Sequence, residues 1–388
     1  MSTLTPAQAA QIAKSVYNLR MYSIEQLARR GETMGCDGMF QTGADSRLTG
    51  RSGGLIAVKQ LSGFGYIARG TSAYAGDILI ATRGTDTMYD WLSNFNVAVQ
   101  KGPGGTPVHA GFHEVWKSFA AEIASFVRGQ NIATVHCVGH SLGGALATLN
   151  ADHFSSLGTA VKLYTFGSPR VGDLFFSRSL SQRVGAENIY RVHHHADPVP
   201  KIPLFPFFHV PWANEGYRVA GGPGGLISKA AHSMEKTYIP GMGAHSWADL
   251  ALAGGVGAGE VAPATWLEQI GSNGNGILIG SAWALQMIGK ALGWLLAKVG
   301  QLAAGALGLA LTAGMTVLDR LAWMLARGAT LSLEVSRYVG NLIGAIFRFL
   351  GRGLMRGASL TLDFIRWVLG LLFDALAIVA RRAFALLG

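Results

Sequence analysis

A serine between two glycines is the first feature of this sequence that could carry chemistry. In the stretch HCVGHSLGGALATL, Gly139, Ser141 and Gly143 follow the pattern G-x-S-x-G, after an apolar run and before a helix-forming one. This pattern is typical of a serine on a sharp turn from strand to helix, where small neighbours let the two elements approach closely. The hydroxyl is then exposed, and the backbone N–H of Leu142 can face a developing oxyanion. A Gly-rich structural turn is the alternative, but the context predicts that Ser141 is a nucleophile.

A carboxylate and a histidine would complete such a site. Asp197, in YRVHHHADPVPKIP, ends an apolar run before two prolines. Its place after the serine and before a histidine follows the chain order of hydrolases with this turn, and it would orient an imidazole and stabilise its protonated form. His209, His232 and His245 come later in the chain. We favour His232, which begins a polar, helix-like turn in KAAHSMEKTYIP; His209 and His245 remain alternatives.

Alternating strands and helices must position these side chains. Four apolar runs each lead into a polar loop and predict buried strands: 76–85, 131–140, 161–170 and 187–200. Helical patterns lie between them, at 111–128, 142–157 and 172–184. This order predicts an α/β fold with a mostly parallel sheet, in which ligand chemistry gathers at the carboxyl ends of the strands.

The run of three histidines, His193 to His195, resembles a metal site but is not expected to be one. Adjacent residues on a strand point to opposite faces, so the three imidazoles cannot converge on one ion. We therefore assign no metal and expect no cofactor. The two cysteines, Cys36 and Cys137, cannot form a disulfide framework, and Cys137 is expected to be a small core residue.

Six motifs in order resemble the class 3, or fungal-type, lipase family in a bacterial form. They are ATRGTDTMYDWLSNF, VHAGFHEVW, VGHSLGGALATL, YTFGSPRVGD, HHADPVPKIP and HSMEKTY. The resemblance covers roughly Ile78–Tyr238 and does not extend to the last third of the chain. It implies an α/β-hydrolase fold and ester hydrolysis by Ser141, His232 and Asp197.

The resemblance also implies an oxyanion hole and a lid. The residue after Arg-Gly, here Thr85, would supply one oxyanion contact, and Leu142 would supply the other. The segment DTMYDWLSNFNV falls where the family carries its lid, so Trp91, Leu92 and Phe95 would face lipid or the closed site; plain core packing is the alternative. The aromatic insertion FPFFHVPW at 205–212 departs from the family pattern and is either an acyl groove or a buried loop.

The last third of the chain has a different composition. GSNGNG at 271–276 is a flexible linker, which divides a lipase domain (1–270) from an apolar or amphipathic, all-α region (277–388). From Gly276 onward there are 11 Lys and Arg against 4 Asp and Glu, and no proline. A cationic, apolar region suits anionic lipid better than nucleic acid, so we expect no nucleic-acid partner.

Polar residues in this tail repeat every 11 positions: Asn341, Arg352, Asp363 and Asp374 form one series, and Arg337, Arg348 and Ser359 form another. An 11-residue period keeps one polar stripe aligned along a long helix, and such a stripe can face lipid headgroups while the apolar remainder sinks among acyl chains. Val299–Leu318 has no charge over 20 residues and is long enough to span a bilayer. A helical bundle that packs on the catalytic domain, or a segment kept soluble by a partner, are the alternatives.

Together these features predict a lipolytic carboxylic ester hydrolase, a phospholipase A or acylglycerol lipase, whose C-terminal helices bind or enter membrane. The alternative is a membrane-inserting or pore-forming protein in which the hydrolase domain is secondary. The N-terminus lacks the pattern of a cleavable signal peptide. The pairing of a lipase with apolar helices resembles bacterial phospholipase effectors exported by a signal-independent secretion system, for which a chaperone or immunity protein would be a partner. A cytoplasmic enzyme on the inner leaflet or on storage granules is the alternative, and a membrane-associated location is expected in either case.

Overall fold

The computed structural model describes most of the chain in two compact units. The described residues are 2–52, 60–84, 99–203, 207–212, 214–222, 228–243, 245–253, 262–272, 282–302, 317–353 and 359–385. The first unit comprises Met1–Val256 together with Arg382–Gly388, and the second comprises Gly257–Arg381.

The first unit is built on an eight-stranded mixed sheet in the order β1-β3-β4-β7-β8-β9-β10, with β2 paired to β3. The pairs from β4 to β10 are parallel, whereas β1, β2 and β4 run antiparallel to β3. The strand bounds are β1 Phe40–Gln41, β2 Arg47–Ser52, β3 Gln60–Gly70, β4 Ile78–Thr82, β7 Thr134–His140, β8 Ala160–Phe166, β9 Ile189–His193 and β10 Tyr217–Arg218. A separate hairpin pairs β5 (Val99–Lys101) with β6 (Pro107–His109). The predicted α/β fold with a mostly parallel sheet is confirmed.

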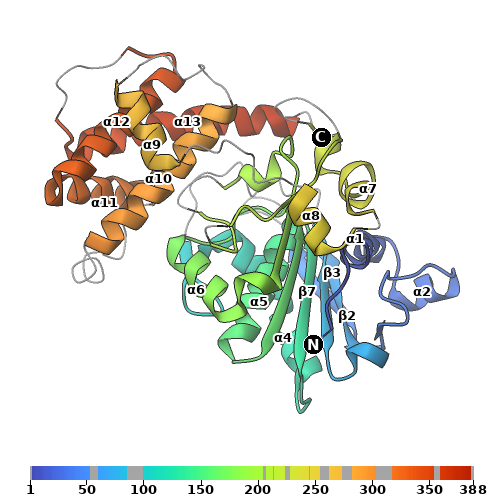
Figure 1. Ribbon diagram of the computed structural model, residues 1–388. Coiled ribbons are helices and arrows are strands. Elements are labelled where there is room, and N and C mark those ends of the chain that lie inside the picture. Colours follow the sequence, from blue (N-terminus) through green and yellow to red (C-terminus); the bar gives the residue numbers. More distant parts are fainter. Residues whose placement is uncertain are drawn as a thin grey trace. The chain divides into compact units, whose positions relative to one another are not determined.

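Helices cover both faces of this sheet (Figure 1). The ribbon shows α4, α5 and α6 on one side and α1, α7 and α8 on the other. The helix bounds are α1 Pro6–Ser15, α2 Ile24–Arg29, α4 Ala110–Val127, α5 Leu142–Ser156, α6 Leu174–Val184, α7 Ile239–Met242 and α8 Trp247–Ala253. The sequence placed α4, α5 and α6 within two residues of these bounds because each begins after a strand and has a recognisable apolar period.

The N-terminal helix α1 packs against the sheet. Thr5 and Gln8 form a capping box at its start, with Pro6 in the first turn. Leu4 and Ile12 are fully buried in the core that lies under this face of the sheet. A short 3-10 helix, η1 (Val16–Arg20), continues directly from α1. The packing of α1 therefore sets the position of η1.

The second unit is helical. Its helices are α9 Pro263–Ser272, α10 Ala282–Leu302, α11 Val317–Leu331, α12 Leu333–Phe349 and most of α13 Leu362–Ala385, which belongs to this unit up to Arg381. The ribbon shows α12 among the other helices of this unit (Figure 1), and its apolar side chains, such as Val335, Leu342 and Ile346, are buried. No helix in the described part of the chain is long and apolar enough to cross a membrane. Most of the candidate span Val299–Leu318 lies outside the described residues.

The predicted long helix of the tail is two helices. After α12, the N–H of Arg352 donates to the carbonyl of Phe347 and that of Gly351 to the carbonyl of Arg348. Gly351 has φ +66°, so these two bonds form a Schellman motif, which ends a helix. The 11-residue period could not reveal this break because Gly351 does not disturb the spacing of the polar residues. The expectation of one continuous stripe is wrong.

Part of that stripe binds another helix of the same unit. The Asn341 amide donates to the Leu267 carbonyl at 2.9 Å, and the Arg348 guanidinium donates to the Ile270 carbonyl at 3.1 Å. The Ile270 carbonyl lies in the last turn of α9, where the helix leaves acceptors unsatisfied, and Leu267 lies one turn earlier. α9 therefore groups with the later helices, although the sequence placed it before the linker at 271–276.

Candidate active site

Ser141 lies on the turn between β7 and α5. Its φ is +60° and its ψ is −134°, backbone angles that side chains rarely adopt. A Cβ on Gly139 would lie 2.2 Å from the Gly143 carbonyl oxygen, and a Cβ on Gly143 would lie 2.2 Å from the Thr82 carbonyl oxygen. Only glycine therefore fits at either of these two positions, two residues before and two residues after the serine. The G-x-S-x-G pattern corresponds to a strained strand-to-helix turn, as the sequence predicted.

The structure brings Ser141, His232 and Asp197 together. His232 Nε2 lies 2.9 Å from Ser141 Oγ. On the other side of the ring, His232 Nδ1 lies 2.8 Å and 3.0 Å from the two carboxylate oxygens of Asp197. Ser141 and Asp197 are buried, whereas 15% of the His232 side chain is exposed. This arrangement can pass a proton from the hydroxyl to an imidazole that a carboxylate orients.

Asp197 has further donors that compensate for the burial of its charge. The Val199 N–H donates to one carboxylate oxygen at 2.9 Å, and the Tyr238 hydroxyl donates to the other. Burial, followed by the nearby carboxylate of Asp197, raises the pKa of Tyr238 well above its usual value, so this phenol remains a donor at any physiological pH. A buried carboxylate with three partners is held in one orientation. Tyr238 lies in the HSMEKTY motif, but no feature of the sequence predicts its contact with Asp197.

The other histidines considered from the sequence lie elsewhere. His209 is partly buried, and its Nε2 donates to the Pro200 carbonyl at 2.7 Å. His245 is exposed near the start of α8. Neither imidazole is hydrogen-bonded to Asp197 or Ser141 in the described part of the chain. The geometry selects His232 among the three.

Leu142 is the first residue of α5 and is buried directly beside Ser141. The first N–H groups of a helix have no acceptor within the helix, so the Leu142 N–H is available to an oxyanion. Thr85, the other predicted oxyanion residue, lies outside the described residues, as do the predicted lid residues Trp91, Leu92 and Phe95.

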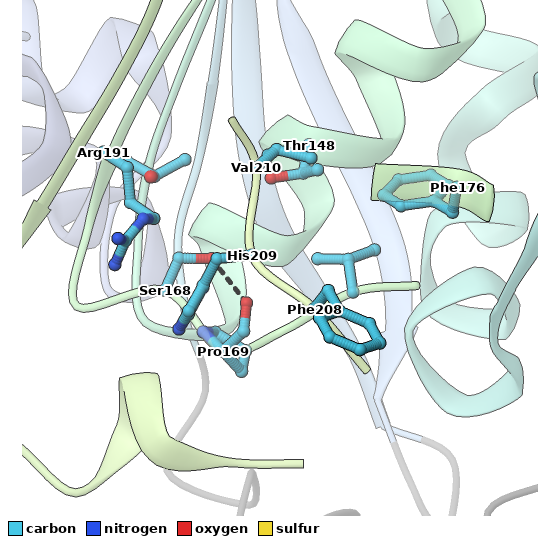
Figure 2. Close-up of a pocket in the computed structure, with 10 residues that line it drawn as sticks. Thr148, Ser168, Pro169, Phe176, Arg191, Phe208, His209 and Val210 are labelled. Carbon is cyan, nitrogen blue, oxygen red and sulfur yellow. Dashed lines mark hydrogen bonds between the residues drawn. The ribbon is translucent and has the colours of Figure 1, made fainter. Parts of the chain in front are cut away.

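Figure 2 shows a small cavity next to the aromatic insertion. It has a volume of about 10 Å³, which is enough for about one water molecule and not for an acyl chain. Phe208 and Val210 line it from the insertion, and Phe176 lines it from α6. Phe207 is buried beside the His109 ring, at a centroid distance of 5.6 Å. The described part of the insertion, 207–212, is thus partly buried, and the cavity that it lines is too small for an acyl chain.

The histidine run ends β9 and continues into the following loop. His193 is the last residue of β9. His194 follows it, and its Nε2 donates to the Gly221 carbonyl at 2.7 Å while its Nδ1 accepts the Ala196 N–H. Within the described residues, no three His, Cys, Asp or Glu side chains are placed to hold a metal ion.

Comparison with known proteins places this geometry in context. Residues 79–207 match the family described as lipase (class 3). The chain is 39% identical over 153 residues to secreted mono- and diacylglycerol lipase 1 of Fusarium solani, a match that covers 38% of this chain and 45% of that protein. It is 32% identical to phospholipase A1-II 3 of Oryza sativa, covering 37% of this chain and 44% of that protein.

The chain thus spans less than half the length of these curated relatives. Among solved structures, mono- and diacylglycerol lipase from Aspergillus oryzae matches with 19% identity and a TM-score of 0.41, covering 59% of this chain and 83% of that one.

Proposed function

Residues 79–207 belong to the class 3 lipase family, and from this we propose that the protein is a carboxylic ester hydrolase that cleaves lipid esters, either acylglycerols or phospholipids. The observation that carries the proposal is the hydrogen-bonded series from Ser141 through His232 to Asp197. The names of the relatives, two lipases and a phospholipase among them, support the substrate class.

Each side chain has one role in the proposed mechanism. Ser141 Oγ attacks the ester carbonyl carbon while His232 Nε2 takes the hydroxyl proton, and the carbonyl oxygen becomes an oxyanion that the Leu142 N–H stabilises. The oxyanion collapses, the C–O bond to the alcohol breaks, and His232 returns the proton to the leaving alcohol. Water then cleaves the acyl-enzyme by the same steps. Asp197 stabilises the imidazolium throughout, and Thr85 is the proposed second oxyanion donor.

The test compares the wild-type protein with Ser141→Ala and with Ser156→Ala. Ser156 is exposed at the end of α5, so its hydroxyl makes the matched control. Each protein is incubated with phospholipid vesicles and with emulsified diacylglycerol, and the products are identified by mass spectrometry. We expect fatty acid from wild type and Ser156→Ala and at least a 10³-fold lower rate from Ser141→Ala. Hydrolysis retained by Ser141→Ala would refute the assignment. Vesicle leakage without hydrolysis by all three proteins would favour the membrane-inserting alternative.

We further propose that the helical unit binds an anionic membrane surface. Five large apolar side chains of this unit are 41% to 91% exposed: Leu302, Leu331, Leu333, Leu362 and Trp367. They lie in a region with an excess of Lys and Arg. Exposed apolar side chains among positive charges favour an interface that offers both acyl chains and anionic headgroups.

Negative charge introduced at two of these side chains tests the membrane proposal. We expect the Leu333→Glu, Trp367→Glu double variant to sediment with phosphatidylglycerol vesicles at least tenfold more weakly than wild type. Leu157 and Leu252 are exposed in the first unit, 66% and 81%, so Leu157→Glu, Leu252→Glu is the matched control and should bind normally. Equal losses in both double variants, or in neither, would contradict a surface on the helical unit.

A further inference from the structure

A tyrosine of the N-terminal segment reaches the catalytic side chains through His140, the residue directly before Ser141. Tyr17 Oη lies 2.9 Å from His140 Nδ1. His140 Nε2 lies 2.8 Å from the backbone carbonyl oxygen of His232. The Gly84 N–H donates to the same Tyr17 oxygen at 3.1 Å. Tyr17 thus connects the loop after β4, the turn that carries Ser141 and the backbone of His232.

The direction of each hydrogen bond follows from what its atoms can do. A carbonyl oxygen only accepts, so His140 Nε2 carries a proton and donates to His232. Burial, followed by the neighbouring His232, lowers the pKa of His140 well below its usual value, so the ring is neutral and its Nδ1 is an acceptor. The Tyr17 hydroxyl therefore donates to Nδ1, and its oxygen accepts the Gly84 N–H. One hydroxyl fixes the tautomer of His140 and binds the loop after β4.

Gly84 lies very close to the nucleophile. A Cβ added to Gly84 would lie 2.7 Å from Tyr17 Oη and 3.1 Å from Ser141 Cβ. Thr85, the proposed oxyanion residue, follows Gly84 directly in the sequence. The bond from the Gly84 N–H to Tyr17 thus anchors the chain immediately before the residue whose placement decides oxyanion stabilisation.

The position of Tyr17 is set by the core. Tyr17 belongs to η1, whose Val16 and Leu19 are fully buried. The preceding chain is pinned at Leu4, whose N–H donates to Tyr164 Oη at 3.1 Å and whose carbonyl accepts the Trp247 indole N–H at 2.8 Å. The phenol is therefore a fixed point against which the other parts of the site can be aligned.

We propose that Tyr17 is a positioning residue for the reaction at Ser141. Its hydroxyl holds the chain at Gly84 against the nucleophile and, through His140, holds the backbone of His232. The inference rests on the proposed ester hydrolysis. It extends the functional unit beyond residues 79–207, because Tyr17 precedes that segment. Displacement of a reacting group by about 1 Å costs about 10²-fold in rate, so a lost anchor has a measurable effect.

The experiment uses Tyr17→Phe, which removes only the hydroxyl, and Tyr22→Phe as the matched control two residues after η1. Initial rates are measured with soluble p-nitrophenyl butyrate. In parallel, long-range ¹H–¹⁵N spectra of ¹⁵N-histidine-labelled full-length protein report the His140 tautomer, with the signal assigned by its loss in His140→Gln. We expect Tyr17→Phe to lower kcat about 10- to 100-fold with KM changed less than about twofold. Its His140 ¹⁵N signals should move, while Tyr22→Phe should match wild type in every measurement.

Two results overturn the proposal: a wild-type kcat in Tyr17→Phe, or a lower kcat while the His140 signals stay unchanged. If wild type itself cleaves no ester, the proposed function fails, and the spectra still decide the linkage. A His140 signal that moves in Tyr17→Phe and not in Tyr22→Phe then supports the connection between Tyr17 and His140. An unmoved signal refutes that connection as well.

Discussion

A methyl group added at Gly167 should displace the side chains of the candidate active site. It follows β8 directly, with φ +54°. A Cβ there would lie 2.7 Å from Asp197 Oδ2, 2.9 Å from Tyr238 Oη and 3.1 Å from His232 Nδ1. The alanine methyl of Gly167→Ala would thus contact the groups that hold the imidazole in place.

The size of the effect follows from two separate costs. The left-handed backbone costs an alanine about 1–2 kcal/mol. The contact with Asp197 is 0.7 Å shorter than the 3.4 Å at which ordinary contact begins. Since Asp197 is fully buried and held by Val199, Tyr238 and His232, its carboxylate cannot retreat without weakening a hydrogen bond. Overpacking of this kind costs about 1–3 kcal/mol more, and the misplaced imidazole should lower kcat/KM about 10²-fold.

Gly158→Ala separates these costs. Gly158 has φ +80°, and no atom lies within 4 Å of the point that an alanine Cβ would occupy, so its alanine variant carries the backbone cost alone. We expect Gly158→Ala to lower the thermal midpoint by about 2–8 °C and to keep wild-type kcat/KM. Both variants are assayed by calorimetry and by initial rates on a soluble ester. If Gly167→Ala hydrolyses the ester within about twofold of Gly158→Ala, the steric argument is wrong.

Three further predictions follow from buried contacts. Tyr238→Phe removes a donor from the Asp197 carboxylate, so kcat should fall about tenfold with little change in KM, which steady-state kinetics on a soluble ester will measure. Burial lowers the pKa of His109 to about 4. Between about pH 6.5 and pH 4 the unfolded chain therefore binds more protons than the folded protein, so the free energy of unfolding falls as the pH is lowered. The amide of His109→Asn can still cap α4 but does not titrate. In urea titrations across this pH range, the variant should lose about 3 kcal/mol less of its unfolding free energy than wild type. Arg348→Ala should lower the unfolding free energy of the helical unit by about 1–2 kcal/mol in the same titrations, whereas Arg337→Ala, which breaks an exposed pair, should change it by less than about 0.5 kcal/mol.

Local features of the sequence were sufficient for the nucleophile and for the elements around it. Gly139 is required by a close contact with Gly143 within one strand-turn-helix unit, so the pattern and the structure carry the same information there, whereas Gly143 is also required by the Thr82 carbonyl of the neighbouring strand β4. The helix after Ser141 and the capping box of α1 are equally local, since caps and apolar periods act within a few residues. The fold class followed because strands and helices alternate along the chain.

Contacts between distant residues could not be read in this way. His232 is 91 residues from Ser141, and only the folded sheet decides that its imidazole, and not that of His209, meets the serine. The residues around Tyr238 in the sequence form no pattern that indicates a function. Its role follows only from the hydrogen bond that its hydroxyl donates to Asp197 in the folded protein. In the tail, the spacing of Asn341 and Arg348 predicted a stripe facing lipid, but their side chains bind the end of α9.

The sequence by itself determined which residue types could react, the turn that carries Ser141 and the order of strands and helices, because each of these depends on a few consecutive residues. Only the tertiary structure decided which histidine, which tyrosines and which backbone groups surround that serine. Tyr17 is the clearest case: 123 residues separate it from His140, and no local pattern marks it. Its role arises because α1 packs on the sheet and brings η1 to the carboxyl ends of β4 and β7. Which side chains meet there depends on the packing of these elements and not on how close the residues are in the sequence.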